Sequence, residues 1–316
     1  MKIVFNKKIV DGPWGGGNQM LMMLAAYLRR RGHSVFYSIE GLQEKPDIIV
    51  IMDVKESSCS IAMDSLVDFK KKHNVKIVHR VNDNGSHRKF DNNRSDEKMI
   101  FINKLLADKT VFISGWLKEY YEEKGLFVKD SCVIHNGTDR GLFFSNNEVR
   151  GVDDPIKIIT HHWSSNLSKG YETYNEINEF CVKNPDVATF CFLGNPNTEH
   201  FYCQNIISPK PYKEIPSYLR ARDIYVTATQ FESGGCHLIE GMACGLIPFV
   251  RNGGGGTEEY VDGFGINYSN SEDFINKLVA LRNNYDLYLA HKKKIQEYAY
   301  GAKEMCEKYL EIFRGN

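Results

Sequence analysis

The sequence predicts an α/β protein built from two doubly wound parallel sheets, and three observations carry this prediction. Short β-branched runs alternate with helical patterns along nearly all of the 316 residues. The runs are apolar throughout, as expected for parallel strands covered by helices on both faces. The alternation breaks once, at 137–155, where Gly, Asn and Asp gather before a proline. We therefore expect one domain at 1–150 and a second at 151–316.

The first domain is expected to open with a strand and an amphipathic helix. "KIVF" (2–5) has the pattern of a buried strand, and 19–31 carries apolar residues at helical spacing on one face. Gly32 ends that helix, and the next strand begins within "GHSVFYS". The further elements expected are strands at 47–52, 75–80, 109–114 and 131–135, with helices at about 60–73, 95–107 and 115–124.

The second domain repeats the alternation. Its expected strands, with helices between them, are 156–160, 186–194, 204–208, 223–228 and 246–250. The last part of the chain, about 271–314, has a helical pattern throughout and ends in the amphipathic segment "KEMCEKYLEIF". This last helix can pack on its own domain or cross back to the first one.

Composition narrows the class of protein. Hydrophobic residues make up 42% and charged residues 25%, as in ordinary globular proteins, and a net charge of zero argues against nucleic acid as a partner. Residues 1–150 carry 24 basic and 19 acidic side chains, or +5, and the remainder 16 and 21, or −5. This asymmetry fits either a first domain that meets an anionic ligand or membrane surface, or two unrelated surfaces.

Cysteine usage and the chain start indicate a compartment. None of the eight cysteines forms a C-x-x-C pair, so a zinc site or redox motif is disfavoured, and a reduced, cytoplasmic protein is expected. "MKIVFNKKIV" has no apolar signal segment, and no run approaches the ~20 apolar residues that span a bilayer. We expect a cytoplasmic protein, with peripheral membrane contact through the first domain as an option.

Ligands of open parallel sheets bind beyond the carboxyl ends of the strands. Four polar segments take that position here: the glycine loop after the first strand, "HRVND" (79–83), "HHWSSNLSKG" (161–170), and the segment after 223–228. If the two sheets face each other, all four line one cleft between the domains.

The glycine loop "WGGGNQ" (14–19) lies between a strand and a helix. Its glycines let backbone N–H groups approach a ligand, and a helix N-terminus favours an anion. It is not G-x-G-x-x-G, so a nicotinamide cofactor is not indicated. We expect Gly16 and Gly17 to contact a phosphate or sugar, with Trp14 and Asn18 beside them. The alternative is a tight turn without a ligand.

Two further segments supply polar side chains. Lys169 lies just before a helix, where it can neutralise a phosphate or remain a solvated lysine. His161, His162 and Trp163 are polar lining or simple packing, and adjacent strand residues point to opposite faces, so the two histidines are poor joint metal ligands.

In "VHRVND" (78–83), His79 can bind a sugar hydroxyl or move a proton, unless it is a core histidine. Arg80, Asn82 and Asp83 accompany it as cleft candidates.

Glu232 and Glu240 flank the turn "SGGC" in the segment 230–245. Helical spacing places Glu240 about 80° beyond two full turns and about 8 Å or more along the axis, too far for a shared proton. The pair can hold two parts of a long ligand, with the N–H groups of 234–236 (Gly234, Gly235 and Cys236) on an anion between them. A nucleotide diphosphate sugar has this layout. The alternative is that Glu232 or Ser233 caps the helix and Glu240 lies on the surface.

This stretch resembles the E-x7-E motif of the family 4 retaining glycosyltransferases of GT-B fold. Supporting matches spread over nearly the whole chain, in the family's order. They are "GPWGGGNQMLMMLAAYLRRRGHSV", "FISGWLKEYYEEKG", "VIHNGTD", "SKG" and "HLIEGMACGLIPFVRNGGGGTEEYVDGFG". The resemblance implies two Rossmann-like domains that face each other across a cleft, the first for the acceptor and the second for the donor.

The resemblance also implies roles. Glu232 would contact the donor sugar and support the oxocarbenium-like transition state, either electrostatically or as a nucleophile. Glu240 would bind the ribose hydroxyls, and His79 would lie near the transferred sugar. Lys169 would neutralise the pyrophosphate, assisted by backbone amides of the two glycine turns. Glu259 matches a family glutamate, although the adjacent Glu258 competes for that position.

One position departs from the family pattern. An arginine is usual five residues before the Lys-Gly lysine, and this chain has Ser164 there. Phosphate neutralisation would then depend on Lys169, on helix dipoles, or on another base such as Arg80 or Arg251.

The expected function is retaining transfer of a sugar from a nucleotide diphosphate donor to a hydroxyl of a glycan, glycolipid or small molecule. No cofactor and no metal are expected. The alternatives are a sugar-nucleotide epimerase or hydrolase of the same fold, or a binding module without turnover. Backbone contacts around 210–212 are a candidate site for the base, but the identities of the base, the sugar and the acceptor are not encoded in these motifs.

Overall fold

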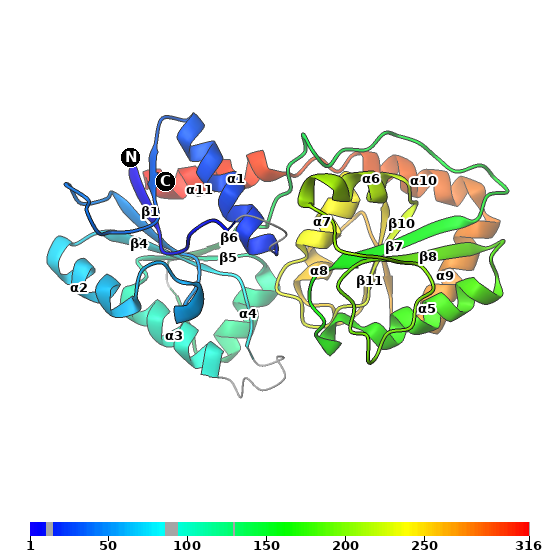
Figure 1. Ribbon diagram of the computed structural model, residues 1–316, viewed down its shortest axis with the longest axis horizontal. Coiled ribbons are helices and arrows are strands. Elements are labelled where there is room, and N and C mark those ends of the chain that lie inside the picture. The colour runs from blue at the N-terminus through cyan, green and yellow to red at the C-terminus, as the bar shows by residue number, and fades with distance from the viewer. Residues whose placement is uncertain (11–14, 86–93, 129, 316) are drawn as a thin grey trace. The chain divides into compact units, whose positions relative to one another are not determined.

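The computed structural model describes residues 1–10, 15–85, 94–128 and 130–315. The chain forms two compact units, Met1–Gly137 with Ala302–Asn316, and Thr138–Gly301 (Figure 1). The boundary therefore lies at Gly137, and the predicted boundary after residue 150 falls inside the second unit. The last helix belongs to the first unit, so of the two alternatives for this helix, the crossing back is correct.

The first unit contains a six-stranded parallel sheet in the order β2-β1-β3-β4-β5-β6. Its strands are β1 (Lys2–Phe5), β2 (Ser34–Phe36), β3 (Ile48–Ile51), β4 (Lys76–Val81), β5 (Lys109–Phe112) and β6 (Ser131–Val133). Every residue of β3 is buried, because helices cover both faces of the sheet.

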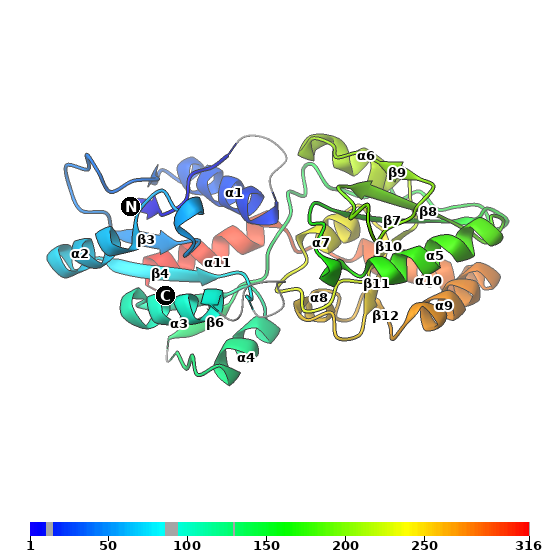
Figure 2. The same ribbon diagram turned by 60° about the horizontal axis from the view of Figure 1, so that its bottom comes forward.

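Helices of the first unit lie in two layers (Figures 1 and 2). The pair α1 (Gly16–Arg30) and α11 (Ala302–Arg314) pack against each other on one face. The other face is covered by α2 (Met63–His73), α3 (Arg94–Leu106) and α4 (Gly115–Glu123), with the short η1 (Glu56–Ser58) after β3. Met305 and Tyr309 of α11, one helical turn apart, are fully buried, which explains why this helix docks on the first unit.

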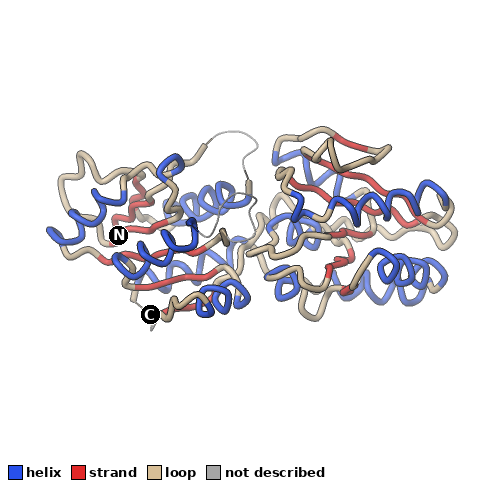
Figure 3. The backbone as a smooth tube through the Cα atoms, turned by 90° about the horizontal axis from the view of Figure 1, so that it is seen from below, coloured by secondary structure: helices blue, strands red, loops and turns tan. Residues whose placement is uncertain are grey.

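The second unit contains another six-stranded parallel sheet, in the order β12-β11-β10-β7-β8-β9. Its strands are β7 (Ile156–His162), β8 (Ala188–Gly194), β9 (Ile206–Ile207), β10 (Ile224–Thr227), β11 (Ile247–Arg251) and β12 (Ile266–Tyr268). Its helices are η2 (Leu167–Lys169), α5 (Tyr171–Lys183), η3 (Tyr212–Glu214), α6 (Ile215–Arg220), α7 (Cys236–Ala243), α8 (Gly256–Tyr260), α9 (Ser271–Asn283) and α10 (Tyr285–Gln296). Figure 3 shows the helices in blue outside the strands in red.

Strand order locates the switch point of each sheet. In the second unit the first strand, β7, is flanked by β8 and β10, so the chain reverses direction across the sheet between β7 and β10. In the first unit the same reversal lies between β1 and β3. Ligands of doubly wound sheets bind at such points.

The predicted doubly wound parallel sheets are confirmed, but one strand was missed and the prediction for the tail was wrong. The strand β12 was not anticipated, since three residues are too few to show a pattern. The tail is not one continuous helix, because α9, α10 and α11 are separated by breaks. Within the described residues, no helix combines the length and apolar character needed to cross a membrane.

Candidate functional site

The switch point of the second unit brings two loops together. Strands β7 and β10 pair as far as Ile159 and Tyr225, and the two strands themselves end at His162 and Thr227. The loops are tied again where the Gln230 N–H donates to the Ser168 carbonyl at 2.9 Å. Gly170 has φ +82°, and a Cβ there would lie 2.3 Å from the Ala228 carbonyl oxygen. Only glycine permits this approach.

Lys169 and Glu232 form an ion pair across these loops. Their side chains are 14% and 20% exposed, so both remain reachable from solvent. The Glu232 backbone is fixed, because its N–H donates to Gly254 at 2.9 Å and its carbonyl accepts from Gly256 at 2.7 Å. Thus the two residues predicted to hold phosphate and sugar are adjacent.

The turn after Glu232 differs from the predicted helix start. Helix α7 begins only at Cys236, with Gly235 as N-cap and no side chain capping it, so neither Glu232 nor Ser233 is a cap. Since Glu232 precedes the helix, the helical spacing assumed between the two glutamates was wrong. The Cys236 N–H donates to the Gly234 carbonyl at 3.1 Å, so this amide is already used within the turn.

Glu240 lies on α7 and is only 7% exposed, which excludes the surface alternative. Its Oε2 lies 2.8 Å from Nε2 of His161, at the end of β7. His161 therefore belongs to this site as a partner of Glu240. From the sequence, His161 could be assigned only to polar lining or to simple packing. The local sequence pattern does not show that β7 and α7 approach each other.

Two other histidines surround Lys169. Burial lowers the pKa of His162 and of His237 well below the usual range, and the Lys169 charge lowers both further. His162 points away from His161, with its ring packed against Phe192 at 4.9 Å between centroids. Both are neutral at pH 7, so they add no permanent positive charge to the site.

Ser164 stands where the family pattern has an arginine, and it supplies no charge. It is exposed, and its hydroxyl accepts from the Asn166 N–H at 3.2 Å. Arg251 donates to the Thr173 hydroxyl at 3.3 Å, in the first turn of α5. Lys169 is thus the cation in direct contact with Glu232 among the described residues.

Of the two candidate family glutamates, Glu258 has a structural contact. Its Oε1 accepts from the Gly253 N–H at 2.9 Å and closes the glycine turn before α8. Which of the two glutamates matches the family position stays a prediction.

In the first unit, β4 ends differently from the prediction. His79 is fully buried, its Nδ1 lies 2.9 Å from the Asn103 amide nitrogen, and burial lowers its pKa to about 3. Arg80 is 2% exposed and donates to Asn136 at 2.8 Å. These positions correct the two predictions: His79 is a neutral core histidine, and Arg80 anchors the segment that leaves the first unit. Neither is placed to touch a sugar or a phosphate.

The glycine loop retains some of its predicted features. Gly16 begins α1 and Gly17 follows in its first turn, with no side chain capping that helix. Asn18 does not project toward a ligand, since its amide donates to the Val10 carbonyl at 2.9 Å and its oxygen accepts from the Val10 N–H at 3.0 Å. Trp14 lies outside the described residues.

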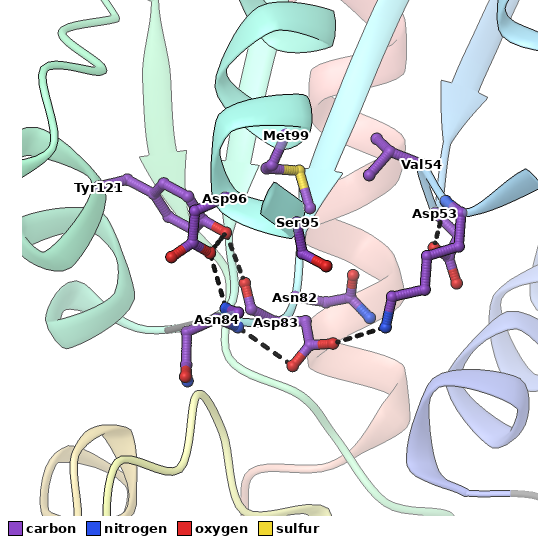
Figure 4. Close-up of a pocket in the computed structure, with 11 residues that line it drawn as sticks. Asp53, Val54, Asn82, Asp83, Asn84, Ser95, Asp96, Met99 and Tyr121 are labelled. Carbon is purple, nitrogen blue, oxygen red and sulfur yellow. Dashed lines mark hydrogen bonds and ion pairs between the residues drawn. The ribbon is translucent and has the colours of Figure 1, made fainter. Parts of the chain in front are cut away.

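A polar pocket of about 30 Å³ opens where β3 and β4 end in the first unit (Figure 4). Asp83 lies 3.6 Å from Nζ of Lys55, and Asn82 lines the same pocket. A Cβ at Gly17 would lie 3.8 Å from the Asn82 amide, which places the start of α1 beside this pocket. The other polar lining residues are Asp53, Asn84, Ser95, Asp96 and Tyr121.

Most of these pocket residues were missed by sequence reasoning, except Asn82 and Asp83. Asp96 is 1% exposed and accepts from the Gly85 N–H at 2.6 Å, which fixes the loop after β4. Its position in the first turn of a helix could have signalled such a contact.

Comparisons with known proteins agree with this architecture. Residues 203–301 match the family model described as Glycosyl transferases group 1. The chain is 25% identical over 199 residues to an uncharacterized glycosyltransferase, MJ1178, of Methanocaldococcus jannaschii, covering 57% of this chain and 51% of that protein. The chain thus spans about half the length of the curated relative it matches.

The solved structures that cover essentially the whole chain include the following three. Anabaena Alr3699/HepE in complex with UDP and glucose superimposes with a TM-score of 0.74 at 15% identity, covering 100% of both chains. The fold is GT-B. Sucrose-phosphate synthase from Thermosynechococcus elongatus follows with a TM-score of 0.70 at 13% identity, covering 99% and 98%. WaaG, a glycosyltransferase involved in lipopolysaccharide biosynthesis, follows with a TM-score of 0.66 at 13% identity, covering 100% of both.

These matches support a glycosyltransferase of GT-B fold, with two Rossmann-like domains. The group 1 match lies within the second unit and includes Glu232 and Glu240.

Proposed function

We propose that the protein transfers a sugar from a nucleotide diphosphate sugar to an acceptor hydroxyl, with retention of the anomeric configuration. The observation that carries the proposal is the partly exposed Lys169–Glu232 pair at the switch point of the second unit, with Glu240 on the helix after it. A cation beside one carboxylate and a second carboxylate on the next helix match the three parts of such a donor.

The donor's parts are assigned by charge. Lys169 neutralises the pyrophosphate as the bond to the sugar breaks, assisted by the free end of α7 at Gly234 and Gly235. Glu232, released from Lys169 when the phosphate arrives, faces the sugar and stabilises its developing positive charge. Glu240 accepts hydrogen bonds from the ribose hydroxyls. Uridine is our first choice of base, because the complex of Alr3699/HepE contains UDP.

We assign the acceptor to the pocket of the first unit. One buried water needs a cavity of about 10–15 Å³. The pocket, at about 30 Å³, therefore holds two waters or one hydroxymethyl group of a sugar. The Lys55–Asp83 pair can donate to and accept from the same hydroxyl. The three carboxylates that line the pocket, at Asp53, Asp83 and Asp96, are each paired with a lysine, so the lining has no excess positive charge among the described residues and an uncharged sugar end fits better than a phosphate.

Asp83→Asn tests this acceptor assignment. We expect it to raise KM for the acceptor severalfold while KM for the donor stays unchanged. An equal rise in both would contradict the assignment.

Transfer is proposed to need no metal, and full activity in excess EDTA would support this. The cytoplasmic location and the membrane-peripheral option stay predictions.

The test is a thermal-shift screen of UDP-, GDP-, ADP- and TDP-sugars, followed by incubation of the sugar that binds with hydroxyl acceptors. A specific donor raises the melting temperature, because it binds only the folded state. Glycosylated acceptor with unchanged anomeric configuration is the expected product. An epimerised sugar without acceptor would favour the epimerase alternative, release of free sugar would favour hydrolysis, and binding without turnover would favour a binding module.

A further inference from the structure

The buried pair His161–Glu240 differs from the exposed pair Lys169–Glu232. The side chains of His161 and Glu240 are 5% and 9% exposed, and Nε2 lies 2.8 Å from Oε2. Within the described residues, Oε1 of Glu240 has no hydrogen-bond partner, yet it is not among the fully enclosed polar atoms that lack one. One carboxylate oxygen is therefore held by the protein, and the other is accessible.

His161 is held independently of Glu240. The backbone N–H of His161 donates to the Tyr225 hydroxyl at 3.1 Å, and the backbone carbonyl of His161 accepts from the same hydroxyl at 3.0 Å. Tyr225 lies in the last residue pair of the β10–β7 ladder, so its hydroxyl continues the strand contact after the ladder ends. The His161 ring also stands edge-on to the Tyr225 ring, with centroids 5.4 Å apart.

The same tyrosine fixes the position of α7. A Cβ on Gly241 would lie 2.6 Å from Cδ2 of Tyr225, so the helix rests directly on the ring at the residue after Glu240. His161 and the helix that carries Glu240 therefore both contact the side chain of Tyr225, which is fully buried.

The hydrogen bond to Glu240 indicates which ring nitrogen of His161 carries a hydrogen. An ionised carboxylate only accepts, so Nε2 of His161 must carry the hydrogen. Nδ1 is buried and has no hydrogen-bond partner within the described residues. The ring holds Oε2 of Glu240, and the second carboxylate oxygen stays available for a ligand.

We propose that His161 is a positioning residue that orients the Glu240 carboxylate toward the ribose diol of the donor. It holds Oε2, so that the remaining lone pairs of the carboxylate meet the two vicinal hydroxyls. The proposal rests on the proposed function, in which Glu240 binds the ribose. It adds a residue outside the motif positions, and it predicts that selectivity for the sugar of the nucleotide depends on this histidine.

The test measures binding of nucleotides, without turnover. Titration calorimetry compares UDP, GDP and ADP with their 2′-deoxy and 3′-deoxy forms. In the wild type, loss of a hydroxyl bonded to a charged group is expected to weaken binding about tenfold or more. His161→Phe keeps a ring but removes the donor, so the ribose and deoxyribose forms should bind almost equally. His161→Gln keeps an N–H donor and should restore part of the preference.

His162→Phe is the matched control, since this neighbouring histidine is equally buried but packs against Phe192 on the opposite face. It is expected to keep the ribose preference whatever its effect on stability. Melting temperatures of all variants without nucleotide show whether they are folded.

The outcomes separate the two proposals. An unchanged ribose preference in folded His161→Phe would overturn the role of His161 alone. If none of the three ribonucleotides binds the wild type, the proposed function fails, and the role of His161 fails with it. An equal loss of preference in His161→Phe and His162→Phe would show a general packing effect and would also overturn the inference.

Discussion

In the loops after β7 and β10, charged side chains are paired but still reachable, whereas within β4 they are enclosed. Lys169 and Glu232 keep 14% and 20% of their side-chain exposure. His79 and Arg80, in the corresponding region of the first sheet, keep 0% and 2% and bond to Asn103 and Asn136. Polar residues in the loops after the strands of one sheet therefore stay accessible, whereas those inside a strand of the other belong to the core.

The difference comes from the position of these residues relative to the strand end. Lys169 and Glu232 lie in the loops after β7 and β10, next to residues in the left-handed conformation, Gly170 and Phe231. His79 and Arg80 instead lie within β4 itself, where helices cover both faces. A polar residue inside a parallel strand is enclosed, and one in the loop after it can meet a ligand.

Glu232→Gln should have the largest effect. It keeps the size of the side chain but removes the charge that stabilises the transition state, so transfer should fall about 10²–10³-fold. Binding of the nucleoside diphosphate should change little. Steady-state kinetics and calorimetry measure the two effects, with the exposed Glu172→Gln on α5 as control. Unchanged transfer would remove Glu232 from the mechanism.

Gly170→Ala should destabilise the second unit. The substitution places a methyl group 2.3 Å from a backbone oxygen in a left-handed conformation, and we expect a loss of about 2–3 kcal/mol in the free energy of unfolding. Gly263→Ala has φ +77° but open space around it, and should cost about 1 kcal/mol. Urea denaturation of both variants compares them. Equal losses would show that the close contact of the two loops is unimportant.

Lys169→Met should weaken phosphate binding. Loss of a charge-assisted hydrogen bond is worth about 1.5–3 kcal/mol, or roughly 10- to 100-fold in Kd for the nucleoside diphosphate. Binding of the nucleoside without phosphate should be unaffected. Lys183→Met, an exposed lysine on α5, is the control. Wild-type affinity in Lys169→Met would mean that another base, such as Arg251, holds the phosphate.

His79→Asn should change the pH dependence of stability. The pKa of His79 is about 3 in the folded protein and about 6.5 when unfolded, so the unfolded chain binds more protons between these values. Its contribution is fully present above about pH 6.5 and is lost on acidification, by up to about 1.4 kcal/mol per pH unit. Urea denaturation from pH 7 to 5 should show a shallower slope in the variant. An identical slope would contradict a neutral core histidine.

The sequence was sufficient for the fold and for the adjacency of some site residues. Apolar runs of four to seven residues locate most strands, and glycine turns locate the loops that carry Lys169 and Glu232. It was insufficient where tertiary contacts decide. The pattern "VHRV" cannot show that Asn103 encloses His79, and no local signal connects His161 with Glu240, 79 positions away.

The most direct test of the donor site is hydrogen–deuterium exchange of the intact protein, with and without the nucleoside diphosphate that binds in the screen. We predict slower exchange at 161–170 and 229–241 in the second unit, and unchanged exchange across 76–81 of β4. Protection confined to the first unit, with no change at 161–170 or 229–241, would contradict a donor site at the switch point between β7 and β10.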